Sequence, residues 1–298
     1  MSIHLRSVDM HPSLAVAEGG VAGGPPLLLL HGVTRDHGDW AALLPRVASG
    51  WRVIAVDQRG HGRSARADRY LVTDYAADAV RLVRDNIREP VTILGHSLGA
   101  MVAAAVAAEI PDLVRGLVLE DPPFHAMGER IAGTPWQSQF SGMREAALHG
   151  GTVDDLATAI AAIQLPRPDG SLVRLGDLRD PAAIRWSAEC LARLDPETLT
   201  PVIAGRWLDG YDWFGSASAI QCPVRLLQAD PAAGGALSDA DRDGFATAAA
   251  DCVVETFPGV GHLIHWTEPD RVADAIDAML TSHRHTSTIA LEPREERR

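Results

Sequence analysis

The chain has 298 residues, 46% of them hydrophobic, which is enough to bury one large core or two modest ones. Acidic residues outnumber basic ones by 39 to 27, and the formal net charge is -12. A nucleic-acid-binding protein normally presents a basic face, so this balance argues against a nucleic-acid partner. No apolar stretch approaches the length of a transmembrane helix, which argues against a membrane span.

Short apolar runs alternate with longer amphipathic segments in the first part of the chain. Buried strands are expected at 27–30, 51–56, 91–94 and 113–119. Helices are expected between them, around 39–48, 70–87 and 97–109. Strands that alternate with helices form βαβ units, and hence a parallel sheet covered on both faces. The more polar opening segments, near 3–8 and 13–18, predict an antiparallel edge.

The pattern changes in the second part of the chain. Between 125 and 219 the apolar spacing is helical, and no segment has a clear strand pattern. The strand pattern returns at 224–228 and 253–257, and a final helix is expected at 269–280. We therefore predict one α/β core, made of residues 1–124 and 220–282, which is interrupted by a helical cap at 125–219. The charged segment 283–298 predicts a disordered tail.

The motif with the clearest chemistry is Gly-His-Ser-Leu-Gly at positions 95–99. It follows the expected strand at 91–94 and opens an Ala-rich helix, the setting in which a GxSxG motif forms a sharp strand-to-helix turn. Glycine is needed on both sides of the serine, because a Cβ atom there would clash across so tight a turn. The motif predicts Ser97 as a nucleophile.

A second loop, His31-Gly32-Val33, directly follows the expected strand at 27–30. Acyl transfer needs two backbone N–H groups aimed at the oxyanion, one from the residue after the nucleophile and one from a loop of this kind. Leu98 and Val33 occupy these positions. We predict that their amides form the oxyanion hole.

A serine hydroxyl also needs a base, which a histidine near the C-terminus can supply. His262 lies in a glycine-containing loop after the last expected strand, and it is the predicted base. His265, close to the final helix, is the alternative. His96, adjacent to the nucleophile, is expected to be a structural or pocket-wall residue.

The acid of the triad has more than one candidate. Asp230 ends the strand at 224–228, where a carboxylate could accept the His262 N–H and fix its tautomer. Asp230 is therefore the preferred acid. Asp121, after the strand at 113–119, is the main alternative, and Asp239 and Asp241 are lesser ones.

With these residues in place, the chain resembles the α/β-hydrolase superfamily, in its branch of cap-bearing serine hydrolases. The resemblance covers roughly residues 20–282 and rests on four segments: 31–32, 57–64, 95–99 and 259–262. It implies a mostly parallel, eight-stranded sheet with helices on both faces and a helical cap inserted after strand 6. It also implies that the turn at 57–64 is structural. Many relatives have Gly-x-x-Asp where this chain has Gln-Ala-Asp-Pro, a departure that bears on the acid.

The cap is expected to roof the active site and to help form a substrate pocket. The candidate pocket residues are His31, His96, Phe124, Trp136, Trp186 and Trp213. Epoxide hydrolases and haloalkane dehalogenases of similar type use an aspartate nucleophile, so the serine at 97 argues against their chemistry.

The predicted function is hydrolysis of a small to medium apolar carbonyl compound, an ester, lactone or thioester, without a metal or cofactor. The alternatives are carbon–carbon bond hydrolysis or a lyase or cyclase step on a natural-product intermediate, and a ligand binder without catalysis.

The three cysteines, Cys190, Cys222 and Cys252, form no CxxC pair, and the N-terminal segment lacks a secretory signal pattern. These features predict a cytoplasmic enzyme, and none of them predicts its oligomeric state.

Overall fold

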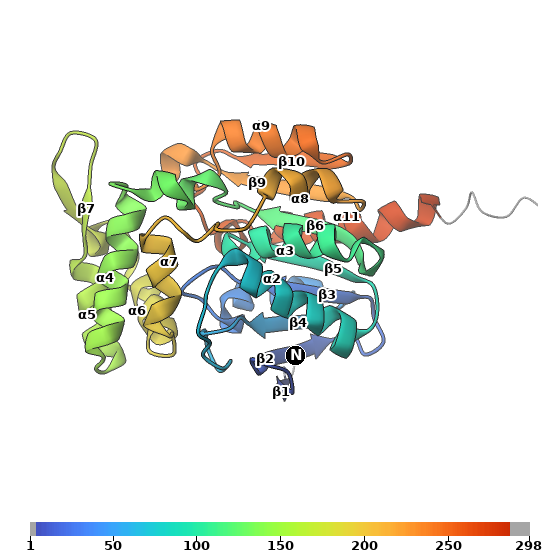
Figure 1. Cartoon of the computed structure of the whole chain (residues 1–298), viewed down its shortest axis with the longest axis horizontal. Coiled ribbons are helices and arrows are strands. Elements are labelled where there is room, and N and C mark those ends of the chain that lie inside the picture. The colour runs from blue at the N-terminus through green and yellow to red at the C-terminus, as the bar shows by residue number, and fades with distance from the viewer. Residues whose placement is uncertain (1–3, 287–298) are drawn as a thin grey trace, which may run out of the picture.

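The structure, a computed structural model, describes residues 4–286, with residues 281–286 described by their backbone alone (Figure 1). Its centre is an eight-stranded sheet with the order β1-β2-β4-β3-β5-β6-β9-β10. The strands are β1 (His4–Val8), β2 (Leu14–Gly20), β3 (Pro26–Leu30), β4 (Arg52–Asp57), β5 (Val91–His96), β6 (Val114–Glu120), β9 (Val224–Ala229) and β10 (Cys252–Phe257). This sheet confirms the predicted fold class.

The direction of pairing follows from the sequence patterns. From β4 to β10 every pair of neighbouring strands is parallel, whereas β2 runs antiparallel to both β1 and β4. All five residues of β3 are buried, because the strand has helices over both faces and needs apolar side chains on each. In β1, four of the five residues are exposed, as expected of a polar edge strand.

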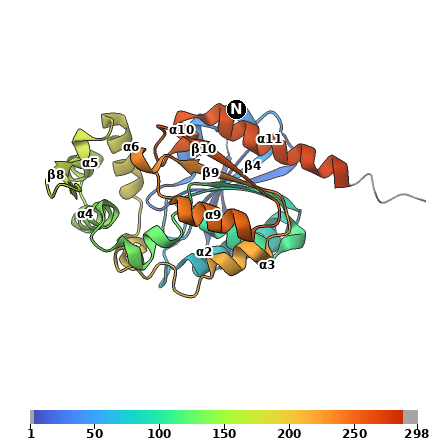
Figure 2. The ribbon, with the colours of Figure 1, turned by 90° about the horizontal axis from the view of Figure 1, so that it is seen from above.

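Helices cover both faces of the sheet (Figure 2). One face carries α2 (Val72–Arg81) with its π-helical continuation η2 (Leu82–Ile87), α3 (Leu98–Glu109), α8 (Trp213–Ala219) and α9 (Asp239–Ala248). The other face carries η1 (His37–Ala42), α1 (Leu44–Val47), α10 (Ile264–Thr267) and α11 (Pro269–Thr286). Two short 3-10 turns, η3 (Pro111–Leu113) and η8 (Pro231–Ala233), complete the core. Nine of the twelve residues of α3 are buried, which explains why this helix is apolar all round.

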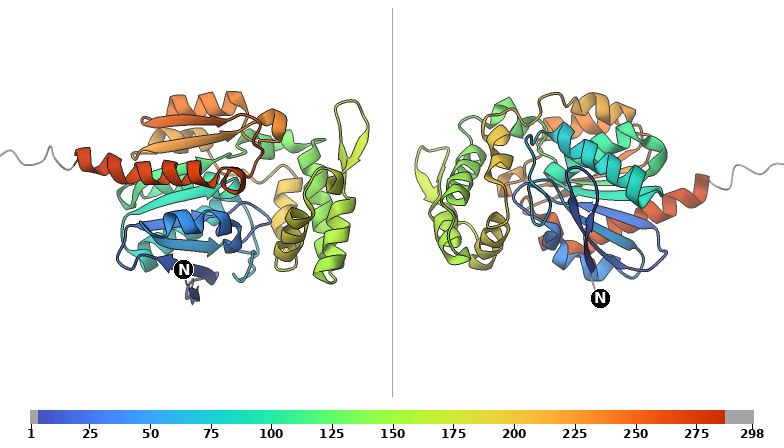
Figure 3. Two further views of the ribbon diagram at one scale, coloured as in Figure 1. Left: turned by 180° about the vertical axis from the view of Figure 1, so that it is seen from behind. Right: turned by 60° about the horizontal axis from the view of Figure 1, so that its bottom comes forward.

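A group of mainly helical elements stands beside the sheet (Figures 1 and 3). It comprises η4 (His125–Met127), η5 (Glu129–Ile131), α4 (Pro135–His149), α5 (Val153–Ala162), η6 (Leu175–Asp177), α6 (Pro181–Leu191), η7 (Pro196–Leu199) and α7 (Thr200–Ile203). The group also contains a small antiparallel sheet of β7 (Gln164–Pro166) and β8 (Leu172–Arg174). We had expected helices alone here, because strands of three residues are too short to show a periodicity.

The element boundaries differ from the prediction in two further places. The predicted cap, 125–219, includes α8, which packs against α3 on the main sheet instead. The final helix continues to Thr286, so the start of the predicted tail, 283–286, is helical. The rest of that tail, 287–298, lies outside the described residues.

Between residues 4 and 286, no helix combines the length and apolarity that crossing a membrane requires.

Candidate active site

Ser97 occupies the strained turn between β5 and α3. Its backbone has φ 53° and ψ -114°, a conformation that non-glycine residues rarely adopt and that is typical of functional turns. A Cβ atom on Gly95 would collide with the carbonyl of Gly99, and one on Gly99 would collide with the carbonyl of Leu30. The turn therefore packs backbone against backbone, which only glycine permits at both positions.

The loop after β3 lies directly beside this turn. A Cβ atom on Gly32 would come within 3.3 Å of the Ser97 Cβ atom and within 2.8 Å of His96 Nδ1. The amides of Val33 and Leu98 donate no hydrogen bond to any other described residue. Leu98 is the first residue of α3, where the N–H groups lack an intrahelical partner. Two free backbone donors therefore come from the two loops that surround Ser97.

His31 braces that loop and does not reach the pocket. Its Nε2 accepts a 3.0 Å hydrogen bond from the backbone amide of Gln58, and its Nδ1 donates to the carbonyl of Gly32 at 2.8 Å. The Gln58 side chain donates in turn to the His31 carbonyl at 2.7 Å. Burial lowers the pKa of His31 and keeps the ring neutral. The predicted pocket residue thus has a structural role.

His262 pairs with Asp121, which directly follows β6. His262 Nδ1 donates to Asp121 Oδ2 at 2.6 Å, and the carboxylate is completely buried. Three backbone amides also donate to this carboxylate. They are those of Ala229 at 3.2 Å, Ala236 at 2.7 Å and Leu237 at 3.1 Å. These donors compensate for burial of the negative charge and hold it in one orientation.

Asp230, the preferred acid in the sequence analysis, does not form the expected pair with His262. Its carboxylate accepts hydrogen bonds from the backbone amides of Ala232 and Gly259, each at 2.8 Å. The bond from Gly259, followed by that from Ala232, lowers the pKa of Asp230. Asp230 therefore ties η8 to the loop that carries His262, and the alternative acid, Asp121, contacts the histidine itself.

The two lesser candidates for the acid are also engaged elsewhere. Asp239 forms an ion pair with Arg242 at 2.8 Å, and Asp241 accepts from His125 Nδ1 at 2.7 Å. Both residues belong to the first turn of α9. Neither is bonded to His262 in the described part of the chain.

Ser97 and His262 line the same pocket, which has a free volume of about 60 Å³. No hydrogen bond joins their side chains among the described residues, as is common before a substrate tightens such a site. The helical group beside the sheet contributes most of the apolar wall: Phe140, Met143, Ile160, Leu175, Ala183 and Ile184. The other lining residues are largely polar, so the pocket combines an apolar side with hydrogen-bonding groups.

Two of the six predicted pocket residues line this pocket, His96 and Trp136. The ring of Trp136 meets that of His262 edge-on, with 5.3 Å between the centroids. Phe124 is completely buried and stacks on the Trp213 ring at 4.9 Å, away from the pocket lining. The remaining tryptophan, Trp186, is also outside the lining. Periodicity identifies such aromatic residues as buried but does not tell which cavity they face.

Sequence reasoning missed two arginines, Arg35 and Arg179, that line the pocket. Arg35 follows the oxyanion loop by two positions, so its place near the site could have been inferred from that motif. Arg179 lies just before α6 in the cap. Nothing in its local sequence distinguishes it from a solvated surface arginine, because its position depends on how the cap packs onto the core.

A second buried histidine, His265, lies between two carboxylates. Its Nδ1 donates to Glu120 Oε1 at 2.8 Å, and its Nε2 is 3.3 Å from Asp39 Oδ2. Burial opposes a charge on this ring, but Glu120 and Asp39 outweigh that effect and raise the pKa of His265 to about 9. Within the same cluster, burial raises the pKa of Asp39, but His265 and Arg35 more than reverse this, and the net pKa is lowered. The cluster is therefore a network of buried ion pairs.

His96 stands between the two histidines. Its ring centroid is 4.6 Å from that of His262 and 5.1 Å from that of His265. Its Nε2 donates to the carbonyl oxygen of His262 at 3.0 Å and so helps to hold the loop in place. Burial, followed by the charges of His262 and His265, lowers the pKa of His96 well below its usual value. A neutral wall residue agrees with its expected role.

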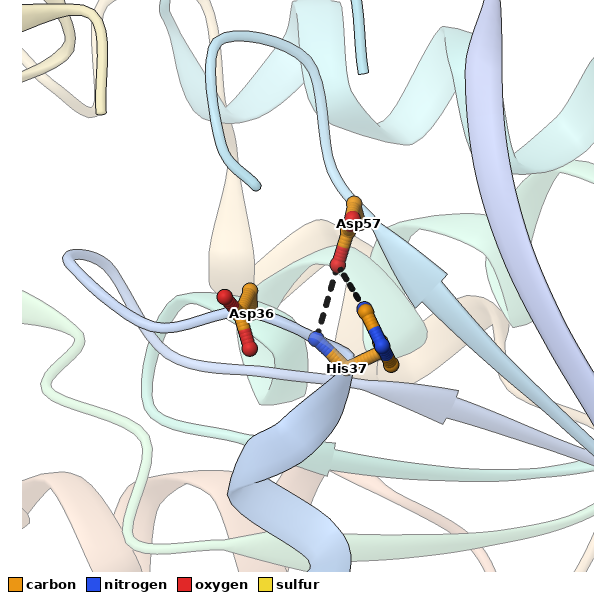
Figure 4. Close-up of side chains that lie close together, drawn as sticks. All are labelled: Asp36, His37 and Asp57. Carbon is orange, nitrogen blue, oxygen red and sulfur yellow. Dashed lines mark hydrogen bonds and ion pairs between the residues drawn. The ribbon is translucent and has the colours of Figure 1, made fainter. Parts of the chain in front are cut away.

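Another cluster of titratable side chains, Asp36, His37 and Asp57, has the composition of a metal site (Figure 4). Its potential ligand atoms lie within 4.8 Å of one another. However, Asp57 accepts hydrogen bonds from the His37 backbone and ring at 2.8 and 2.7 Å, and Asp36 pairs with Arg193 at 2.6 Å. These bonds join the loops after β3 and β4 to the cap. The cluster thus has a structural explanation, in keeping with the predicted scaffold role of Asp57.

The sequence matches the family model of the alpha/beta hydrolase fold over residues 25–182, which is more than half of the chain. This range includes β3 to β6, both loops around Ser97 and much of the cap. The protein therefore belongs to the α/β-hydrolase family.

A curated relative is the 2-(acetamidomethylene)succinate hydrolase of Mesorhizobium japonicum. It is 41% identical over 118 residues, which are 39% of this chain and 42% of the relative. Other relatives are named as an epoxide hydrolase and a lipase of Mycobacterium tuberculosis, and they too are matched over less than half of their length. The chain thus spans less than half the length of these curated relatives, and their reactions differ from one another.

Solved structures resemble nearly the whole chain. The structure of an E-2-(acetamidomethylene)succinate hydrolase has a TM-score of 0.71 and 24% identity, and covers 94% of this chain and 100% of its own. An N-formylmaleamic acid deformylase from Pseudomonas putida S16 has a TM-score of 0.72 and 23% identity, with coverages of 91% and 100%. At this level of identity the likeness shows the fold alone.

Proposed function

We propose that the protein is a serine hydrolase with Ser97 as the nucleophile, His262 as the base and Asp121 as the acid. The observation that carries the proposal is that Ser97, His262 and Val33 line one pocket, while the free amide of Leu98 directly follows Ser97 in the chain. Such a set supplies the three requirements of acyl transfer, which are a nucleophile, a base and an oxyanion hole.

The proposed reaction follows from the hydrogen bonds of His262. Because Nδ1 donates to Asp121, the neutral ring carries its lone pair on Nε2, which can accept the proton of the Ser97 hydroxyl. Ser97 Oγ then attacks the substrate carbonyl, and the amides of Val33 and Leu98 stabilise the oxyanion. His262 returns the proton to the leaving group. Water, activated by the same histidine, then releases the acyl group from Ser97.

The bond that is broken belongs to a carboxylic acid derivative such as an ester, lactone, thioester or amide. Two similar proteins are named for substrates that are themselves carboxylic acids, a substituted succinate and a maleamic acid. The apolar side chains and the small free volume of the pocket support a compact acyl group. We assign the roof of this pocket to a cap formed by the elements from α4 to α7.

Labelling with a fluorophosphonate tests the nucleophile directly. The wild-type protein should carry the adduct on Ser97, as mapped by mass spectrometry of its peptides. Ser97→Ala should abolish the label, while His262→Ala should slow labelling strongly because the hydroxyl loses its base. The matched control is Ser187→Ala, since this hydroxyl also lines the pocket but is bonded to Arg35 and Ala183. Labelling of another residue in the wild-type protein would refute the assignment.

A further inference from the structure

The residues that line the pocket of Ser97 include two arginines and, among the described residues, no aspartate or glutamate. The arginines are Arg35 and Arg179, and Gln139 lines the pocket as well. This lining contrasts with a chain in which acidic residues outnumber basic ones by 39 to 27. A concave site lined by charge of one sign favours a ligand of the opposite sign. The lining therefore points to an anionic ligand.

The two arginines differ in their partners. Arg35 donates to Ser187 Oγ at 3.0 Å, lies 3.9 Å from Asp39 and stands 5.2 Å over the Trp266 ring. Its charge is thus anchored and partly balanced. Arg179 forms no hydrogen bond or ion pair with any other described residue.

Arg179 also lies within the electrostatic influence of Arg35. Arg179 is exposed as a residue, but desolvation of its guanidinium beside the pocket, followed by the positive charge of Arg35, lowers its pKa. Two like charges on one pocket repel each other unless an anion lies near them. The protein supplies no carboxylate to Arg179, so a ligand carboxylate would complete the site.

We propose that Arg179 anchors an anion subsite, and that the substrate carries a carboxylate in addition to the carbonyl attacked by Ser97. The planar guanidinium can bind a carboxylate through two parallel hydrogen bonds, which orient as well as attract it. This inference rests on the proposed function for the position of the reacting carbonyl. Arg179 belongs to the cap side of the pocket and Ser97 to the core, so a substrate bound to both is held at two ends.

Arg179 and Ser97 line the same pocket, so one small ligand can contact both of them. The substrate class is therefore a compact carboxylic acid with a hydrolysable acyl group, such as a monoester or monoamide of a small dicarboxylic acid. Gln139, whose amide has no hydrogen-bond partner among the described residues, can donate to the same carboxylate.

Two esters of succinic acid test the proposal. Monomethyl succinate has a free carboxylate, and dimethyl succinate has none. The wild-type enzyme should show the higher kcat/KM with the monoester, and added salt should reduce that value but not the value for the diester. Arg179→Gln should lower kcat/KM for the monoester by about tenfold to a hundredfold, as expected for loss of a charge-assisted hydrogen bond, and should leave the diester nearly unchanged.

Arg185→Gln is the matched control, because Arg185 lies in α6 and pairs with Asp154 and Glu189 outside the pocket lining. The Arg185→Gln variant should keep the wild-type preference for the monoester. A wild-type preference for the diester, or an unchanged preference in Arg179→Gln, overturns the subsite.

A binding measurement separates this proposal from the proposed function. Calorimetry with Ser97→Ala should detect monomethyl succinate, and the double variant with Arg179→Gln should bind it at least about tenfold more weakly. If neither ester is hydrolysed by the wild-type enzyme but this difference is found, ester hydrolysis fails and the anion subsite stands. If Ser97→Ala does not bind the monoester, the subsite fails, whatever the result of fluorophosphonate labelling.

Discussion

Two carboxylate–histidine pairs lie side by side at the end of β6, and they serve different purposes. Asp121 contacts His262, while its neighbour in the sequence, Glu120, contacts His265. His262 lines the pocket beside Ser97, whereas His265 is completely buried. One ring nitrogen of His262 remains available for a proton transfer. Both nitrogens of His265 face carboxylates, because Asp39 occupies the other side.

Under the proposed function, the number of carboxylates around each histidine distinguishes the base from the structural residue. A single carboxylate fixes the ring and leaves the other nitrogen for the substrate side, as a base requires. A second carboxylate favours a permanent charge on the ring, which then acts as a structural cation. Glu120 ends β6, and Asp121 follows it with a φ of 45°, so the chain turns between two adjacent acids that serve the two sites. Four predictions test this division, from the largest expected effect to the smallest.

Asp121→Asn should have the largest effect. The amide no longer stabilises the histidine cation or enforces its tautomer, so kcat should fall by about 10⁴-fold, as in other hydrolases with this arrangement. The rate is measured with the best ester found by screening, after circular dichroism has shown that the variant is folded. Asp230→Asn is the control and should retain activity within about threefold of wild type, since Asp230 bonds only to backbone amides. Equal losses in the two variants would contradict the choice of Asp121.

Glu120→Gln should instead reduce stability. Removing one charge from a buried ion pair leaves its partner uncompensated, which typically costs about 3–5 kcal/mol. The free energy of unfolding, measured by urea titration, should fall by that order, while kcat of the folded enzyme stays within about tenfold. A loss of kcat as large as that of Asp121→Asn, with unchanged stability, would show that the two pairs are not divided as proposed.

The pH dependence of stability should reveal His265. Its folded-state pKa of about 9 is above the unfolded value of about 6.5, so the stabilisation is fully present below that lower value and is lost as the pH rises through about 9. The loss should be on the order of 3 kcal/mol. Urea titrations at several pH values measure it, with His265→Gln as the reference for other titrating groups. A parallel pH dependence in both proteins would argue against a charged His265.

The smallest effects are expected from two tryptophans, one beside each pair. Trp136 meets the His262 ring edge-on, while Trp186 donates to Asp39 Oδ1 at 3.2 Å. Trp136→Leu should lower kcat/KM by about twofold to tenfold, the range of one aromatic contact. Trp186→Leu should lower the Tm, because the substitution removes a hydrogen bond from the buried cluster around His265. If Trp186→Leu lowered kcat/KM more than Trp136→Leu, the two regions would be coupled.

Features encoded in short segments could be predicted from the sequence. The apolar runs identify the strands of the core, because a strand buried on both faces needs apolar residues throughout. The turn around Ser97 is also local, since the two glycines that flank it allow a close backbone approach that a Cβ atom would block. The loop with Val33 could be predicted too, because it follows a recognisable strand and supplies only backbone groups.

Features that depend on contacts between distant segments could be identified only in the tertiary structure. β6 and β9 are neighbours in the sheet, so Asp121 and Asp230 follow adjacent parallel strands and both lie near the last loop. A sequence pattern gives each acid the same local setting, and only packing decides which one contacts His262. Helix periodicity likewise does not distinguish α8, which covers the main sheet, from the cap helices.

The sequence by itself therefore determined the fold class, the strained turn at Ser97 and the loop histidine, each through backbone constraints or apolar periodicity acting over a few residues. Only the tertiary structure decided that Asp121 pairs with His262, that Glu120 and Asp39 surround His265, and that Arg179 enters the pocket. The physical reason is the range of the interactions. Hydrogen bonds and ion pairs act over a few ångströms between atoms that the chain brings together from segments far apart.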